Sequence, residues 1–208
     1  MKAILLGLVF CVAQAGAADK EFKPLFNGKN LDGWQGIGGP TTNWKISGGV
    51  LSCTGKPGSR WIATKEEYVD FDLRLEFNTP GNGNSGVFIR APKDGAPWVD
   101  GLEIQVLDDY GEKYKTLKPA QYTGSIYAIQ APSKRATKKS GEWQTMRIRC
   151  EGAKCDVWIN GEHVVKGNLA ELAKANKQPG LKRKSGFIGL QNHASPMHFR
   201  KLRVKRLR

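Results

Sequence analysis

Short segments in which apolar and polar residues alternate dominate the chain, and Gly, Pro and Asn separate them. Such alternation predicts β-strands, because successive side chains of a strand point to opposite faces of a sheet. The predicted strands are residues 44–46, 50–53, 61–64, 71–77, 85–90, 102–106, 124–127, 143–150, 156–159, 162–165, 186–191 and 197–204. One segment, residues 169–176, has a helical period. Many short strands with tight turns predict an all-β sandwich.

Two turns and one loop allow more detailed predictions. Asn160-Gly161 lies between two predicted strands and is a strong signal for a two-residue hairpin. Cys150 and Cys155 flank a second turn of four residues, so they could face each other across two strands. A disulfide and two buried free thiols both remain open, because the Cα separation decides between them. Residues 134–140 predict an exposed basic loop.

The first 18 residues predict a cleaved signal peptide. Lys2 precedes an apolar stretch and then small residues with Ala-x-Ala spacing, and the apolar stretch is too short to span a bilayer. The chain is therefore expected to divide into a signal peptide at residues 1–18 and one domain at residues 19–208, exported to the periplasm or the cell exterior. Lipid attachment at Cys11 is disfavoured, since a lipobox requires a small residue where Phe10 stands.

Composition adds an excess of positive charge to this picture. The chain has 208 residues, of which 39% are hydrophobic and 25% charged, and this is typical of a globular protein. Its 33 Lys and Arg against 19 Asp and Glu give a formal net charge of +14. Nucleic acid is disfavoured as a partner, because no nucleic-acid motif accompanies the charge and export is predicted. Acidic polymers of the cell envelope are the expected partners of the basic surface.

Candidate chemistry follows from which polar residues share a strand face. Alternation pairs Glu103 with Gln105, Phe88 with Arg90, Gln191 with His193, and Ser125 with Tyr127. Aromatic rings cover the apolar sides of sugars, and carboxylate, amide and guanidinium groups bind hydroxyls. The set is therefore typical of a sugar-binding cleft with an acid and a base. The alternative is that these residues form the solvated outer faces of a sandwich.

Eight segments, in order along the chain, resemble one known family. They are LFNGKNLDGW (25–34), NSGVFIR (84–90), GLEIQVLD (101–108), TGSIY (123–127), GEWQ (141–144), WING (158–161), GFIGLQNH (186–193) and FRKL (199–202). From Phe22 to Leu207 the chain resembles the 3-keto-disaccharide hydrolase domain family, formerly a domain of unknown function. The resemblance implies a concanavalin A-like jelly-roll β-sandwich of two antiparallel sheets with a concave sugar-binding face. It also implies cleavage of glycosides that are oxidised at C3.

A 3-keto sugar sets clear demands on the catalytic residues. The ketone acidifies the hydrogen on C2, so removal of that proton can expel the substituent on C1, and water can then add. We expect Glu103 or His193 to be the base and Tyr127 the acid. Arg90 is expected to stabilise the developing negative charge. The expected substrate-binding residues are Gln105, Asp108, Gln191, Phe88 and Ser125.

Three alternatives stay open at this point. Asp108 could cap a turn or hold a calcium ion instead of binding substrate. Glu103, Asp108 and His193 could hold a catalytic divalent metal, but their spacing does not establish it, and no cofactor is predicted. The chain could also be a non-catalytic carbohydrate-binding module, since the same fold serves enzymes and lectins.

Overall fold

The computed structural model describes residues 21–208, and the predicted signal peptide at residues 1–18 lies outside this range. The described strands are β1 (Lys23–Pro24), β2 (Trp34–Ile37), β3 (Trp44–Ser47), β4 (Val50–Cys53), β5 (Trp61–Tyr68), β6 (Phe71–Asn78), β7 (Asn84–Ala91), β8 (Leu102–Leu107), β9 (Trp143–Glu151), β10 (Lys154–Ile159), β11 (Glu162–Asn168), β12 (Gly186–Gln191) and β13 (Met197–Arg206). The helices are α2 (Pro97–Asp100) and α3 (Leu169–Ala175), with 3-10 turns at Thr41–Asn43, Glu112–Tyr114, Pro119–Gln121 and Pro179–Lys182. No helix in this part of the chain is long and apolar enough to cross a membrane.

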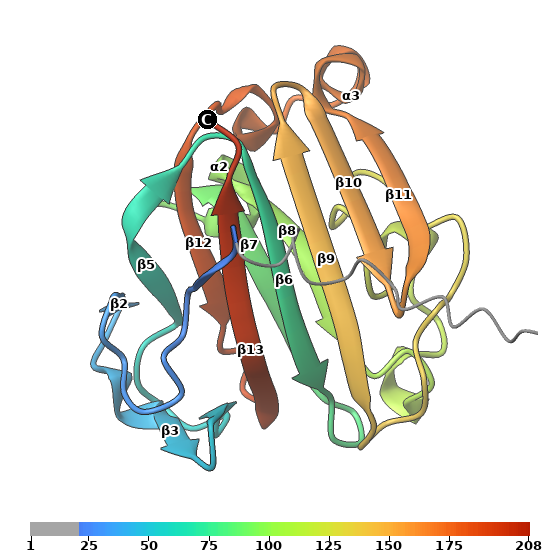
Figure 1. Ribbon diagram of the computed structural model, residues 1–208. Helices are drawn as coiled ribbons and strands as arrows, with labels where there is room; N and C mark the ends of the chain where they lie inside the picture. The colour runs from blue at the N-terminus through green and yellow to red at the C-terminus, as the bar shows by residue number, and fades with distance from the viewer. Residues whose placement is uncertain (1–20) are drawn as a thin grey trace, which may run out of the picture.

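Two antiparallel sheets pack face to face and confirm the predicted sandwich (Figure 1). The eight-stranded sheet has the order β11-β10-β9-β6-β13-β4-β3, with β1 paired to β13. The five-stranded sheet has the order β2-β5-β12-β7-β8 and lies behind the first in Figure 1. Some neighbours are consecutive hairpin strands, whereas others, such as β6 with β13 and β5 with β12, come from distant parts of the sequence, as in a jelly roll.

The core lies between the two sheets and is built by the alternation seen in the sequence. Val87 and Ile89 of β7 and Ile104 of β8 meet Leu73 and Phe77 of β6, and all are fully buried. Each such side chain contributes about 1.5–3 kcal/mol by leaving water. The residues between these apolar positions therefore point to the outer faces of the sheets.

The two detailed turn predictions have clear outcomes. Asn160 and Gly161 both have positive φ angles, 51° and 84°, as a two-residue hairpin between β10 and β11 requires, so this prediction is confirmed. Cys150 and Cys155 are direct neighbours across β9 and β10, and both are buried. Their sulfur atoms lie 3.5 Å apart as free thiols. The structure therefore shows the free-thiol alternative.

One predicted strand, residues 124–127, is wrong. Ile126 forms only isolated bridges, to Ile104 and Gln130, and the surrounding residues form turns. The segment still lies along β8, because the backbone N–H groups of Gly124 and Tyr127 donate to the oxygens of Gln105 and Glu103, each at 2.9 Å. Gly124 and Ala128 have φ angles of 86° and 59°, so the chain bends at both ends of the segment. The predicted helix is confirmed as α3, where the side chain of Asn168 accepts hydrogen bonds from the first helical turn.

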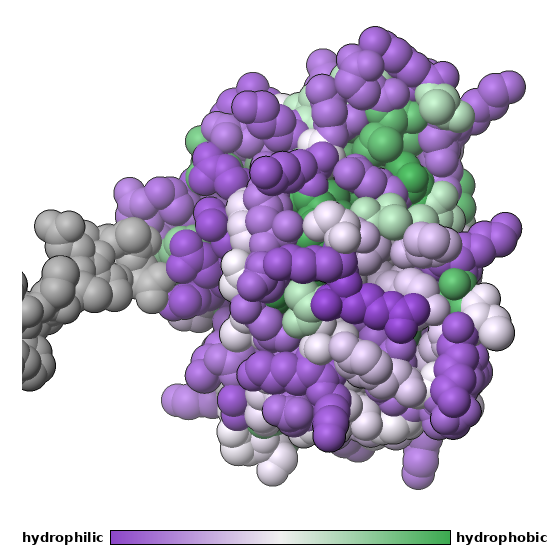
Figure 2. Space-filling view, turned by 90° about the vertical axis from the view of Figure 1, so that its right-hand side faces the viewer, coloured by the Kyte–Doolittle hydropathy of each residue, from purple (hydrophilic) through white to green (hydrophobic). Residues whose placement is uncertain are grey.

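The side of the molecule that β11 and α3 border is mostly hydrophilic (Figure 2). β11 is an edge strand, and within residues 21–208 no further strand pairs with its outer side. Charged side chains such as Glu162 and Lys166 are exposed along it. Charge on an edge strand opposes pairing with another sheet.

Candidate active site

Polar side chains gather on the outer face of the five-stranded sheet. Along β8, Leu102, Ile104 and Val106 enter the core, so Glu103 and Gln105 point to the outer face. Strand pairing places Glu103 opposite Phe88 of β7 and Gln105 opposite Gly86. The face predicted for Glu103 and Gln105 is the one that the structure shows.

A small pocket opens on this face, with a volume of about 170 Å³. Its lining residues are Asn84, Trp98, Glu103, Gln105, Tyr127, Gln191 and His193. Five of the predicted site residues therefore come together from β8, from the end of β12, and from the loops that follow each of these strands. Asn84 and Trp98 were not predicted.

Glu103 has the most unusual environment in the pocket. Only 4% of its surface is exposed, and no cation of residues 21–208 forms an ion pair with its carboxyl group. Burial disfavours the charged form and raises the pKa of Glu103 from 4.5 to about 8. At neutral pH this side chain is therefore a neutral carboxylic acid that can donate a proton.

Two glycines shape the surface around Glu103. A Cβ atom at Gly86 would overlap the Glu103 carboxyl group, so the missing side chain lets Glu103 lie across β7. A Cβ atom at Gly189 would overlap the Trp61 ring in the same way. Trp61 packs edge-on against Phe88, with ring centroids 5.3 Å apart, and forms a second apolar cluster beside the pocket. The polar pocket is thus bordered by buried aromatic rings.

Amide groups in the pocket have unused hydrogen-bonding capacity. Asn84 Oδ1 and Gln191 Oε1 are buried, and neither accepts a hydrogen bond within the described chain. Gln105 Oε1, in contrast, accepts from the backbone N–H of Val106 at 2.9 Å. A buried acceptor without a donor costs about 1–3 kcal/mol, so a ligand hydroxyl that donates to either oxygen would recover this cost.

The rim of the pocket carries three rings. Tyr127 is partly exposed, and its hydroxyl accepts a hydrogen bond from Gln121 Nε2 at 3.1 Å. His193 is exposed just after β12. Trp98 is 42% exposed on the short helix α2, which is unusual for so large an apolar ring. Such an exposed ring beside polar groups can stack against the apolar side of a sugar.

Arg90 does not reach this pocket, and the expectation of a catalytic role is corrected. A register shift where β7 pairs with β12 and a φ angle of 48° at Arg90 interrupt the alternation, so Arg90 does not follow Phe88 on the outer face. Its guanidinium is buried and donates to Asp70 Oδ1 at 3.2 Å. It also donates to the backbone oxygens of Val69, Gly152 and Arg183. Arg90 therefore has a structural role.

Three predicted substrate-binding residues also lie outside the pocket lining. Phe88 shares the predicted face but is covered by its neighbours, and Ser125 is fully buried. Asp108 caps a turn, where its carboxylate accepts from the backbone N–H groups of Asn82 at 2.9 Å and Tyr110 at 3.3 Å. Among residues 21–208 no three or more His, Cys, Asp or Glu side chains are placed to hold a metal ion. The alternative metal site of Glu103, Asp108 and His193 is therefore not assembled.

The fold and pocket together define a concanavalin-like jelly roll with a small polar recess on one sheet. Residues 21–205 match the family described as 3-keto-alpha-glucoside-1,2-lyase-like domain, and the chain belongs to this family. The resemblance seen in the sequence is thereby confirmed.

Three known proteins show how far the similarity extends. A 3-keto-disaccharide hydrolase from Bacteroides thetaiotaomicron is 25% identical over 87% of this chain and 77% of its own length. A crystal structure of a candidate glycosyl hydrolase from Parabacteroides distasonis has 32% identity and a TM-score of 0.77, over 89% of this chain and 99% of its own. The carbohydrate-binding module CBM66 from Bacillus subtilis has 14% identity and a TM-score of 0.56, over 85% and 97%, which shows the fold alone.

Proposed function

We propose that this chain cleaves glycosides that are oxidised to a ketone at C3. The observation that carries the proposal is the pocket itself, where a buried carboxylic acid lies with an imidazole and two unpartnered amide oxygens. The family match and the name of the Bacteroides relative support the substrate class.

The proposed reaction is an elimination followed by hydration. His193 removes the proton from C2, and the C–H electron pair forms an enolate with the C3 ketone. The enolate then forms a C1–C2 double bond, while the aglycone oxygen leaves C1 with its bonding pair and takes the proton of Glu103. Water then adds its hydroxyl to C1 and gives its proton to Glu103, while the proton held by His193 returns to C2. These steps yield the free 3-keto sugar and restore both side chains. Glu103 suits the acid role because its raised pKa of about 8 keeps it protonated at neutral pH.

The number of carboxyl groups in the pocket favours elimination over ordinary glycoside hydrolysis. Ordinary glycosidases place two carboxyl groups across the bond, at separations of about 5–9.5 Å. Glu103 is the one carboxyl group among the described residues that line the pocket. A 3-keto substrate removes the need for a second carboxylate, because the ketone itself stabilises the developing charge.

The remaining lining residues orient the sugar. The oxygens of Asn84 and Gln191 accept hydrogen bonds from sugar hydroxyls, which satisfies two otherwise unpartnered atoms. Trp98 stacks against the ring, and Tyr127 donates its hydroxyl proton to a substrate oxygen while Gln121 holds it in place. Because Arg90 lies elsewhere, the Tyr127 hydroxyl takes the place of the expected guanidinium and donates to the ketone oxygen as negative charge develops on it.

A pair of chromogenic substrates tests the proposal. The purified protein is offered a nitrophenyl 3-keto-glucoside and the same glucoside with its C3 hydroxyl intact, and nitrophenol release is followed. We expect release from the keto form alone, because only the ketone acidifies C2. Binding of the unoxidised glucoside with no turnover of either form would instead support the carbohydrate-binding module and contradict the proposal.

A further inference from the structure

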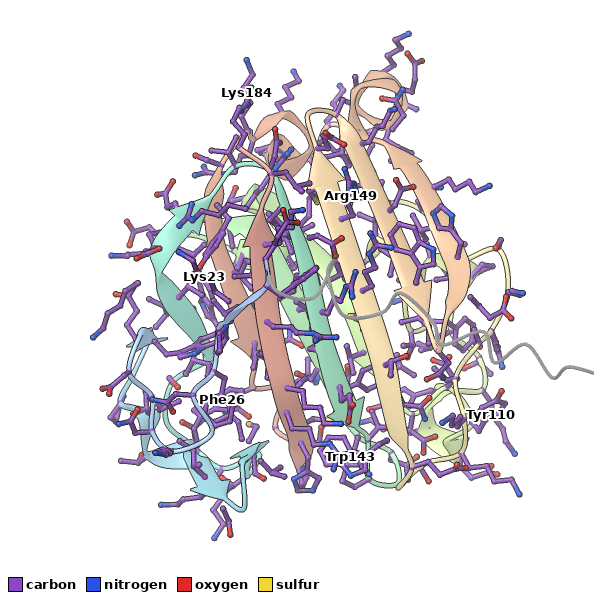
Figure 3. The ribbon with its side chains drawn as sticks, viewed as in Figure 1. Lys23, Phe26, Tyr110, Trp143, Arg149 and Lys184 are labelled. Atoms are coloured by element: carbon purple, nitrogen blue, oxygen red, sulfur yellow. The ribbon has the colours of Figure 1, made fainter. Side chains whose placement is uncertain are left out.

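A second pocket, of about 500 Å³, opens between α3 and the 3-10 turn Pro179–Lys182. We call it the α3 pocket, because Leu169, Ala170 and Ala173 of this helix line it. Lys184, which also lines it, marks this end of the molecule in Figure 3, and Figure 1 shows α3 and the end of β13 at the same end. The α3 pocket shares no lining residue with the proposed active site. A ligand bound here therefore contacts none of the residues proposed for catalysis.

The apolar part of the α3 pocket is aliphatic. Leu169, Ala170 and Ala173 of α3 and Leu181 of the turn contribute to it, and the described lining contains no aromatic ring. Leu169 and Leu181 are buried, whereas Ala170 is exposed. Methylene groups are stabilised when they leave water for such a wall. Sugars, in contrast, are bound by polar groups and aromatic rings. The wall therefore suits an alkyl chain.

Three consecutive basic residues follow Leu181 and line the same pocket. Lys182 and Lys184 are exposed, and no carboxyl group among residues 21–208 forms an ion pair with either of them. Arg183 Nε is buried and donates to no acceptor in the described chain. Leaving a buried donor without an acceptor costs free energy, which an acceptor oxygen of a ligand would recover. These three side chains therefore suit an anionic head group.

The carboxyl group of Asp70, the one carboxyl group among the described lining residues, is already engaged. Its Oδ1 atom accepts from the Arg90 guanidinium at 3.2 Å and from the backbone N–H of Gly152 at 2.9 Å, and its Oδ2 atom lies 3.4 Å from Arg208 Nε. Arg90 also donates to the backbone oxygen of Arg183 at 3.1 Å, which holds the basic segment in place. The fold thus fixes the backbone that carries the positive charge, and less order has to be gained on binding.

We propose that the α3 pocket binds a single-chain amphiphile with an anionic head group, such as a free fatty acid. The alkyl chain lies against the aliphatic wall, and the head group meets Lys182, Arg183 and Lys184. Pockets for small molecules typically have volumes of about 300–1,000 Å³, mostly apolar walls and a few polar groups that fix the orientation of the ligand. The α3 pocket has all three properties.

Calorimetric titration with three probes tests the chemistry of the ligand. Laurate is the anionic probe, octanoate has the same head group on a shorter chain, and dodecyl maltoside has a neutral head group on a chain of the same length as laurate. Each is added below its critical micelle concentration, at neutral pH and near physiological salt. Laurate should bind. Octanoate should bind at least about tenfold more weakly because it lacks four methylene groups, and dodecyl maltoside at least about tenfold more weakly because it has no charge.

Two matched variants of α3 test where laurate binds. Ala170→Glu places a carboxylate in the lining of the α3 pocket, whereas Ala175→Glu places the same charge at an exposed position of the same helix, outside the lining. Ala170→Glu should weaken laurate binding about tenfold or more, because the new carboxylate repels the head group and interrupts the aliphatic wall. Ala175→Glu should stay within about twofold of the wild type.

A second pair of variants serves if Ala170→Glu fails to fold. Lys182→Gln with Lys184→Gln removes two charges from the pocket, and Lys29→Gln with Lys45→Gln removes two from exposed lysines outside it. The first double variant should lose laurate affinity about tenfold or more, and the second should keep it within about twofold.

Several outcomes would overturn the proposal. Equal weakening in a pocket variant and its control would show that net charge alone attracts laurate. Absence of laurate binding, equally tight binding of dodecyl maltoside, or tighter binding of phosphatidylglycerol vesicles than of laurate would overturn it as well. Turnover of the 3-keto substrate should be the same in Ala170→Glu as in the wild type, so failure of this proposal is distinguishable from failure of the proposed function.

Discussion

At the scale of single residues, Glu103 carries the largest electrostatic cost in the proposed site. Its carboxyl group leaves water without gaining a cation, so the neutral form is favoured and the pKa rises to about 8. Arg90 shows the opposite solution, since its buried charge is matched by Asp70 and by backbone oxygens. A buried charge such as that of Arg90 is compatible with a stable fold when it has hydrogen-bonding partners. A buried carboxylic acid that stays neutral, such as Glu103, can donate a proton in a reaction.

The raised pKa of Glu103 predicts how stability depends on pH. Between about pH 4.5 and pH 8 the native state keeps a proton that the unfolded chain has lost, so rising pH favours unfolding. The free energy of unfolding should fall by up to about 1.4 kcal/mol per pH unit across this window because of Glu103. Glu103→Gln removes this penalty. It should match the wild type near pH 4 and exceed it by several kcal/mol at pH 8.

Denaturant unfolding across the pH range measures this difference. Glu142→Gln is the matched control, because Glu142 is exposed in the loop before β9 and should change the pH dependence little. A constant difference between wild type and Glu103→Gln at every pH would contradict the buried-acid account.

At the scale of elements, β7 and β8 form the floor of the proposed site. Alternation along the sequence correctly places Glu103 and Gln105 on the outer face, because β8 is a regular strand. The alternation predicts the wrong face for Arg90. Arg90 has a left-handed backbone conformation at a shift in strand register, and the alternation of apolar and polar residues does not reveal such a shift. It also cannot place Trp98, which lies on the short helix α2 that precedes β8 and follows no periodic pattern.

Gly86 provides a test of this floor. In the wild type, the Glu103 carboxyl group occupies the space that a side chain at position 86 would fill. In Gly86→Ala the new Cβ atom must therefore displace this carboxyl group. We expect at least about a tenfold loss of turnover on the 3-keto substrate, since small displacements of a catalytic group are costly. Gly81→Ala is the control, because a Cβ atom there meets nothing within 4 Å. Full activity in a folded Gly86→Ala variant would show that the position of Glu103 is not critical.

At the scale of the whole molecule, the two outer sheet faces have different chemistry. The five-stranded sheet presents a small recess with a buried acid, and the eight-stranded sheet presents a wide groove lined by arginines. The first face supports the proposed chemistry.

The fold was predictable from the sequence to a greater extent than the site. Strand periods and turn residues such as Asn160-Gly161 act locally, so the sandwich could be read from them. The pocket depends on which strand ends and loops meet in space. Tyr127 arrives from a bent segment and not from the predicted strand, and Asn84 was seen only as part of a family motif. Burial of Ser125 and Phe88 is likewise a tertiary property.

Turnover of a 3-keto-glucoside by variants of the pocket tests the central claim most directly. Aglycone release at neutral pH is compared among the wild type, Glu103→Gln, His193→Ala and the control Glu142→Gln, after folding of each is verified. The account predicts that loss of the acid or the base lowers turnover by about 10²-fold or more, while the control keeps wild-type activity. Wild-type turnover in both Glu103→Gln and His193→Ala would contradict it, because the reaction would then take place elsewhere on the molecule.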